Sequence, residues 1–243
     1  MCVFKRDILG IFFLACCLAG CGEKDSGSSL QANTSMSEAA TMFASIGEYS
    51  KVLDYADSKS SSGDLTPEQE AALDNCNLTE DEMTVGNEES RTMSISGPNC
   101  PIVYNLSASL VSSGNQASGN VIIDFKVVDS SFASSTNTQS FHCVANISGL
   151  RGDTINLSGS FNCSVQTTDL GLIQLSLAMS MQHSSASTTM ELNITAQSNG
   201  KVAIAHVYLH NSSGGTQRVE VRINGQAPSE EIDFSGITEI MAL

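Results

Sequence analysis

Short alternating runs of apolar and polar residues dominate the chain from about residue 91 onward. Gly, Ser and Asn interrupt these runs at regular intervals, which is typical of an antiparallel β-meander. We therefore expect about eight or nine strands within residues 91–243. The runs place them near 91–97, 102–111, 120–129, 139–147, 155–166, 172–182, 188–197, 202–210 and 217–224.

Two short turns predict how three of these strands pair. A two-residue turn at 199–200 would place Met190 opposite Leu209, and a turn at 185–186 would place Met181 opposite Met190. One apolar face would then continue across three strands. It carries a Met-bearing wall made of Leu177, Met179, Met181, Met190, Leu192 and Leu209.

Residues 35–90 carry helical signals instead. A capping box of Ser35 and Glu38 opens a stripe of apolar residues spaced three and four apart, which predicts an amphipathic helix of about 20 residues. The stripe is Ala39, Met42, Phe43, Ile46, Tyr49, Leu53 and Ala56. The stretch 66–69 combines a cap, a proline and a capping glutamine, so a second helix should run to about Asp74. We expect a mainly β (α+β) fold, with N-terminal helices packed on a curled antiparallel sheet as one domain.

The N-terminus has the layout of an export signal. Lys5 and Arg6 precede the apolar run 8–18, which is too short to span a bilayer. The run ends in Leu18-Ala19-Gly20-Cys21. These four residues resemble the lipobox of bacterial lipoproteins, and the likeness covers only the beginning of the chain.

The resemblance implies that residues 1–20 are a signal peptide and that Cys21 carries the lipid of a membrane anchor. In that family an acidic residue after the cysteine is associated with retention in the inner membrane. Gly22 stands there, so we expect the outer membrane, with its periplasmic and surface faces both open. Residues 22–34 are polar and rich in Gly and Ser, as in a flexible tether.

Four cysteines remain after the signal and the lipidated position: Cys76, Cys100, Cys143 and Cys163. An even set in an oxidising compartment predicts two disulfides, for which three connectivities are possible. A loop centred near 153 would place Cys143 opposite Cys163 on adjacent strands. We therefore favour that bridge, together with one between Cys76 and Cys100. The wide gaps between them offer no close pair of the kind that binds zinc.

The charge balance narrows the classes of partner. The chain has 11 Lys and Arg against 26 Asp and Glu, a formal net charge of -15. Such a field repels phosphate backbones, so nucleic-acid binding is excluded. The acids are dense in 64–89, but no calcium-binding loop motif is present, and we expect a solvated acidic surface there.

Candidate catalytic groups are few. His206, Tyr208 and His210 alternate on one predicted strand, and residues four apart on a strand are separated by about 13 Å, too far to share one metal ion. A Ser-x-x-Lys match at 198–201 falls on a turn, whereas the enzymes that use this motif place it at a helix start. We therefore expect no catalytic residues, no metal and no cofactor.

The other side of the predicted sheet is polar and uncharged. Such surfaces can bind glycans by hydrogen bonds, although sugar sites usually add an aromatic ring, and this chain has no Trp. The surface is predicted to include Asn156, Ser158, Ser160, Asn162, Ser164, Gln174, Ser176, Ser180, Thr189, Asn193, Thr195 and Gln197.

Three functions follow as hypotheses. The preferred one is a membrane-anchored, non-catalytic structural or interaction module of the bacterial cell envelope. The alternative is a carrier of a lipid or other apolar ligand in a half-barrel cavity lined by the Met-bearing wall, because methionine surfaces adapt to varied ligands. A glycan-binding or adhesion surface is the third.

Overall fold

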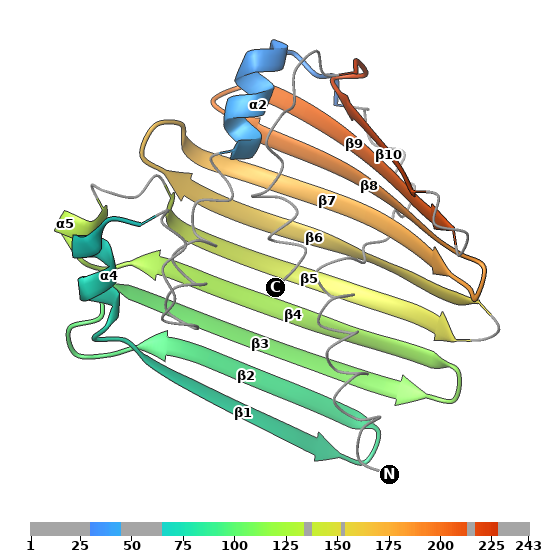
Figure 1. The fold of residues 1–243 in the computed structure, drawn as a ribbon, viewed down its shortest axis with the longest axis horizontal. Helices are drawn as coiled ribbons and strands as arrows, with labels where there is room; N and C mark the ends of the chain where they lie inside the picture. Colours follow the sequence, from blue (N-terminus) through green and yellow to red (C-terminus); the bar gives the residue numbers. More distant parts are fainter. Residues whose placement is uncertain (1–29, 45–64, 134–137, 152–153, 213–216, 228–243) are drawn as a thin grey trace.

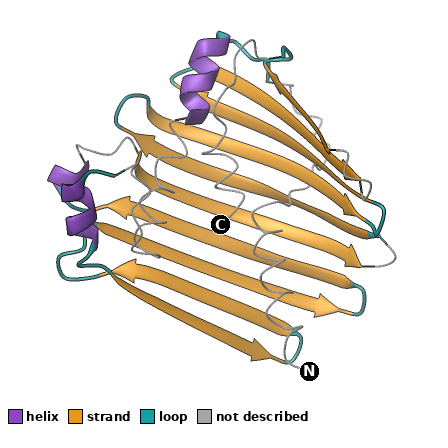
Figure 2. Ribbon diagram, viewed as in Figure 1, coloured by secondary structure: helices purple, strands orange, loops and turns teal. Residues whose placement is uncertain are grey.

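In the part of the chain that the structure describes, the fold is one open antiparallel sheet of ten strands, in which each strand pairs with its neighbours in the sequence. The computed structural model describes residues 30–44, 65–133, 138–151, 154–212 and 217–227. The strands run in order from β1 at one edge to β10 at the other (Figure 1). Their direction turns progressively across the sheet (Figure 2), as the right-handed twist of strands requires.

Strands make up most of the described residues, and the helices are short. The strands are β1 (Asn77–Val85), β2 (Glu88–Ser96), β3 (Ile102–Ser113), β4 (Gln116–Val127), β5 (Thr138–Arg151), β6 (Ile155–Thr167), β7 (Gly171–His183), β8 (Ser187–Ser198), β9 (Lys201–Ser212) and β10 (Gln217–Ile223). The helices are α2 (Met36–Ala44), α4 (Pro67–Leu73) and α5 (Ser130–Ala133). The prediction of a mainly β, antiparallel meander is confirmed.

The predicted strand count was too low by at least one because β1 was not foreseen. Residues 35–90 were expected to be helical, and this is wrong for 77–90, which form β1 and the start of β2. Every residue of β1 is exposed. A strand without a buried face has no reason to alternate apolar and polar residues, so the period-two signal that located the other strands is missing there.

The strand register agrees with the turn analysis. Ser198 pairs with Lys201 around a turn in which Asn199 and Gly200 have φ of 50° and 76°. These left-handed conformations are what a two-residue hairpin needs, and Asn and Gly adopt them most readily. Met190 lies opposite both Leu209 and Met181, as predicted.

The helix starts were also read correctly. Thr66 caps α4, and its partner Gln69 closes a complete capping box. Ser35 and Glu38 form the corresponding reciprocal bonds across the first turn of α2, at 2.8 and 3.3 Å. The predicted helix of about 20 residues begins here, but its part beyond Ala44 lies outside the described residues.

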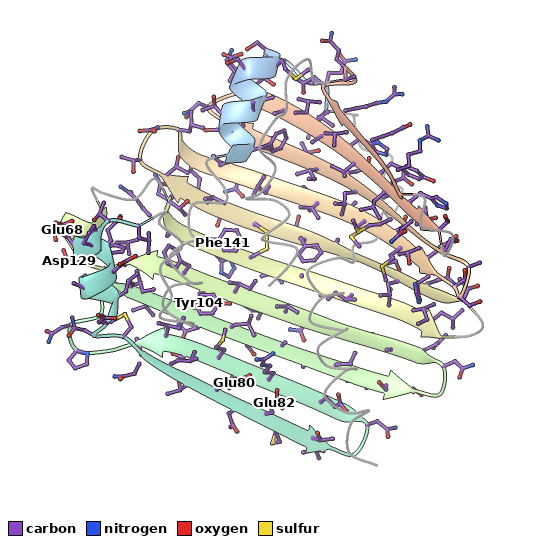
Figure 3. All side chains as sticks on the ribbon, in the orientation of Figure 1. Glu68, Glu80, Glu82, Tyr104, Asp129 and Phe141 are labelled. Carbon is purple, nitrogen blue, oxygen red and sulfur yellow. A yellow bond between two sulfur atoms is a disulfide. The ribbon has the colours of Figure 1, made fainter. Side chains whose placement is uncertain are left out.

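One face of the sheet, called the inner face here, carries the core. Tyr104, Phe125 and Phe141 lie side by side on β3, β4 and β5, with exposed fractions of 0%, 2% and 1%. Figure 3 labels Tyr104 and Phe141 in this row. Burying one such aromatic side chain contributes about 1.5–3 kcal/mol. The same buried cluster includes Met42 and Phe43 of α2.

Two disulfides reinforce this arrangement. Cys76 after α4 is bonded to Cys100 before β3, and Cys143 of β5 is bonded to Cys163 directly opposite on β6. Of the three possible connectivities, the structure has the one that the sequence favoured. The first ties the helical segment to the sheet, and the second joins two adjacent strands within the core.

The N-terminal segment at Asn33 and Thr34 is hydrogen-bonded to the β9 and β10 edge of the sheet. The backbone N–H of Asn33 donates to Val202 O at 3.0 Å, and the N–H of Val202 donates back to Asn33 Oδ1 at 2.6 Å. Asn224 at the end of β10 donates to Thr34 O at 2.8 Å. Residues 33 and 34 of the predicted tether are therefore fixed to β9 and β10.

Candidate interaction surface

The face opposite the core, called the outer face here, is polar along most of its length. Strand alternation sends every second residue to this side. The strand pairings place all twelve predicted Ser, Thr, Asn and Gln residues on it together. The polar surface predicted from the alternation is thus one continuous surface across β6, β7 and β8.

Rows of like residues cross this face. Ser118, Ser148, Ser158 and Ser180 follow one another on β4, β5, β6 and β7. The hydroxyls of Ser148 and Ser158 are 3.1 Å apart. Such a row places one serine on each strand, and neighbouring strands are about 4.8 Å apart.

The described residues of the outer face line three shallow hollows. The first, of about 320 Å³, is lined in part by Asp81, Asp124 and Thr79. The second, of about 390 Å³, contains Asp124 and Lys126 with His142. Both of these hollows therefore carry charged groups.

The third hollow has a volume of about 480 Å³, the largest of the three. Its lining contains no charged residue. It consists of Val111, Ser113, Gln116, Ala117, Ser118, Ser148, Gly149, Leu150, Asn156 and Ser158. We call it the neutral hollow.

His206 and His210, which alternate with Tyr208 on β9, do not come together in a common site. The predicted pairings are confirmed, with Glu191 opposite Tyr208 and Asn193 opposite His206. His206 Nε2 lies 2.8 Å from Glu191 Oε1, diagonally across the strands. His210 Nδ1 instead lies 3.1 Å from Thr189 Oγ1. The two histidines thus have separate partners.

His142 also has a partner of its own, because its Nδ1 lies 2.7 Å from Asp124 Oδ1. Within the described residues, no group of three or more His, Cys, Asp or Glu side chains is arranged to hold a metal ion. His142, His206 and His210 each bond a different side chain on a neighbouring strand, an arrangement that suits a solvated surface.

The Met-bearing wall lies on the inner face, and the structure brings its six residues together. Met179 and Leu192 are opposite each other, with exposed fractions of 2% and 0%. Leu177 and Met190 are also buried, whereas Met181 and Leu209 are partly buried against the same cluster. The wall is part of the packed core.

The inner face becomes charged at the β1 edge. Arg91 of β2 forms ion pairs with Glu80 and Glu82 of β1. Figure 3 shows both glutamates at this edge, beyond the aromatic row. Inward-pointing charges on an edge strand oppose the addition of a further strand, which accounts for acids at a place where helix had been expected.

Among the described residues, two carboxyl groups have perturbed pKa values, and both lie at helix starts. The pKa of Glu38 is lowered by hydrogen bonds from the backbone and side chain of Ser35 and by Lys201. The pKa of Asp129 is lowered by hydrogen bonds from Ser131 and from the Phe132 N–H. These groups cap local structure and lie apart from the three hollows.

The Asn224–Thr34 contact was not foreseen from the sequence. The Asn224-Gly225 pair signals a turn, and both residues have positive φ, 51° and 80°. That signal locates the turn but does not say which distant segment the Asn224 side chain binds.

Comparison of the chain with protein-family models, with curated proteins and with solved structures found no match. The described helices are all too short or too polar to span a lipid bilayer. The outer face and the lipobox resemblance are thus the features of this chain that bear on its function.

Proposed function

We propose that this protein is an exported lipoprotein of the bacterial cell envelope and that it acts as a non-catalytic interaction module. Cys21 carries the lipid anchor, and the outer membrane holds it. The outer face of the sheet is the interaction surface. The observation that carries this proposal is the continuous polar surface across β4 to β8, on which Ser, Thr, Asn and Gln outnumber charged side chains such as Asp124, Lys126 and Glu191.

The size of this surface supports the proposal. Strands β5, β6 and β7 contain 14, 13 and 13 residues. At about 3.3 Å per residue and 4.8 Å between strands, five such strands offer about 40 by 20 Å. This is roughly the 800 Å² that each partner contributes to a standard protein interface.

The fixed residues 33 and 34 support an anchored arrangement. They are bound at the start of β9, beside the β8–β9 turn. Asn33 is twelve residues after Cys21 in the sequence. An extended chain of that length reaches at most about 40 Å. The lipid anchor would thus hold this end of the sheet near the membrane and leave the outer face accessible.

The proposal includes N-terminal helices that pack on the sheet. Ala39, Met42 and Phe43 are buried with the sheet core, and Glu38 forms an ion pair with Lys201 of β9. These contacts support N-terminal helices that pack on the inner face of a curled sheet. The inner face is then the structural side of the module.

The carrier hypothesis receives less support. A carrier needs an apolar cavity of several hundred Å³, and the three hollows found among the described residues lie on the polar face. Met179 and Leu192, which would line the cavity, are packed in the core. Native mass spectrometry of the protein purified without lipid supplements would distinguish the two: a retained lipid supports a carrier, and a clean protein mass opposes it.

The interaction surface can be tested in cells with a photo-activated cross-linking amino acid. It would replace the exposed Ser176 in the middle of the outer face, and in the control it would replace the exposed Ser185 in the β7–β8 turn. We expect adducts with envelope components from position 176 and few from position 185. Equal labelling from both positions, or none from 176, would contradict the proposal.

The anchor is tested separately. The full chain should fractionate with membranes, and the Cys21→Ala variant should not incorporate labelled fatty acid. Both chains keep the same folded residues, so a difference in fractionation reports the anchor alone. Incorporation of fatty acid into Cys21→Ala would show that the lipid is attached elsewhere.

A further inference from the structure

The neutral hollow is the part of the outer face that points to a particular ligand. It occupies two adjacent rows of side chains on four strands. One row is Val111, Ser118, Ser148 and Ser158, and the next is Ser113, Gln116, Leu150 and Asn156. The hollow therefore combines six hydrogen-bonding side chains with two aliphatic ones.

The two aliphatic side chains stand on either side of β4. Val111 on β3 has an exposed fraction of 45%, and Leu150 on β5 has one of 50%. Gln116 and Ser118 of β4 lie between them. A ligand in the hollow would meet amide and hydroxyl groups below and hydrocarbon at both sides.

The lack of charge excludes several ligand classes. An anion such as phosphate needs basic groups, and a metal ion needs carboxylates or imidazoles, but the lining has neither. The net charge of -15 also repels anionic polymers. A fatty acyl chain would leave the hydroxyl and amide groups without hydrogen bonds, which is unfavourable.

We infer that the neutral hollow is a binding subsite for an uncharged saccharide chain. A sugar ring has hydroxyl groups at its edge and C–H groups on its faces, and this combination matches the lining. Gln116, Ser148 and Ser158 supply hydrogen bonds to hydroxyl groups, while Val111 and Leu150 contact C–H groups. The inference rests on the proposed function, because it takes the outer face to be the interaction surface.

Further polar rows extend the subsite. Ser180 continues the first row on β7, and Gln182 continues the second. A chain of several sugar units could lie across the strands and make similar contacts at each step. Each hydrogen bond contributes little in water, so binding should increase with the length of the saccharide.

The test uses the full lipidated chain, held in a detergent without a sugar headgroup. The probes are three neutral hexasaccharides, namely cellohexaose, maltohexaose and the hexamer of N-acetylglucosamine, with the corresponding disaccharides for comparison. We expect calorimetry to give a Kd below about 1 mM for at least one hexasaccharide, and weaker binding of its disaccharide.

Two matched variants locate the site. Gln116→Ala combined with Ser148→Ala removes two exposed polar groups from the hollow. Gln174→Ala combined with Ser176→Ala removes the same two residue types from exposed positions on β7 of the same face. We expect the hollow variant to weaken hexasaccharide binding about tenfold, from the loss of two hydrogen bonds, and the β7 variant to change it less than about twofold.

The alternative outcomes overturn the inference in distinct ways. If no hexasaccharide binds while the Ser176 cross-linker still gives adducts, the saccharide assignment is wrong and the interaction surface stands. If binding is weakened only by the β7 variant, or equally by both, the subsite is not the neutral hollow. If neither binding nor cross-linking occurs, the proposed function fails as well. Circular dichroism of both variants checks that the fold is retained.

Discussion

The side-chain amide of Asn224 donates to both the backbone oxygen and the hydroxyl of Thr34, at 2.8 and 3.0 Å, across a sequence separation of 190 residues. The backbone N–H of Ile204 donates to Oδ1 of Asn224 at 3.0 Å. One side chain therefore joins the N-terminal segment, β9 and the end of β10. It closes the described domain at the end where the tether enters.

Removing this contact should destabilise the domain. Asn224→Ala leaves partly buried polar groups without this partner, and alanine also tolerates the φ of 51° poorly. We expect a loss of about 1–3 kcal/mol in the free energy of unfolding, measured by urea denaturation. Asn224→Gly removes the same hydrogen bonds, but glycine adopts the positive φ easily, so this variant should lose less stability than Asn224→Ala. A larger loss of stability for Asn224→Gly would contradict the role assigned to the positive φ.

The disulfide between β5 and β6 closes a loop within the core. Replacing both Cys143 and Cys163 by Ala should lower the free energy of unfolding by roughly 3 kcal/mol, because the unfolded chain regains conformational freedom. Urea denaturation of this variant and of the one lacking Cys76 and Cys100 would measure the two effects. The separations are 20 and 24 residues, so losses of similar size are expected. A negligible loss in both variants would contradict the constraint argument.

The stability of the fold should depend on pH through Glu38 at the start of α2. Its pKa is lowered below the ordinary 4.5 by hydrogen bonds from Ser35 and by Lys201. A carboxyl with a lowered folded-state pKa stabilises the fold above the unfolded pKa, and this stabilisation is lost as the pH falls through the folded pKa. Denaturation of the wild type and of Glu38→Gln should differ at pH 7 and converge below that lowered pKa. If the difference in stability between the wild type and Glu38→Gln grew as the pH fell, ionised Glu38 would not stabilise the fold.

Two glycines of the sheet provide a matched pair for testing close packing. A Cβ on Gly119 would come within 2.3 Å of the backbone oxygen of Ser109, whereas one on Gly149 would meet Leu157 Cδ2 at 2.6 Å. Backbone cannot move aside as a flexible side chain can, so Gly119→Ala should cost about 1–3 kcal/mol and Gly149→Ala less. Thermal unfolding of both variants checks the order, and the reverse order would show that β3 and β4 can separate locally.

The parts of the fold that local signals specify were predictable from the sequence. Asn199-Gly200 sets a two-residue turn, and a period of two then assigns each neighbouring residue to a face. The pairing of Met190 with Leu209 and the bridge between Cys143 and Cys163 follow from such steps. The polar residues of the outer face were found in the same way.

Strand β1 was not predictable, because its residues are exposed on both faces and the periodic signal reflects burial. The neutral hollow was not predictable as a unit either. Its residues come from the ends of β3 and β5 and the starts of β4 and β6, and only the register of four strands brings Val111, Gln116 and Leu150 together.

The sequence alone predicted the antiparallel meander, the faces of the central strands and the bridge between Cys143 and Cys163, since each depends on local alternation or on one short turn. The bridge between Cys76 and Cys100 was then the remaining pair. The tertiary structure decided that the Met-bearing wall belongs to the core, that Asn224 binds Thr34, and that the largest of the three hollows carries no charge. These relationships arise from packing between segments far apart in the chain, and local alternation and turn signals do not encode such packing.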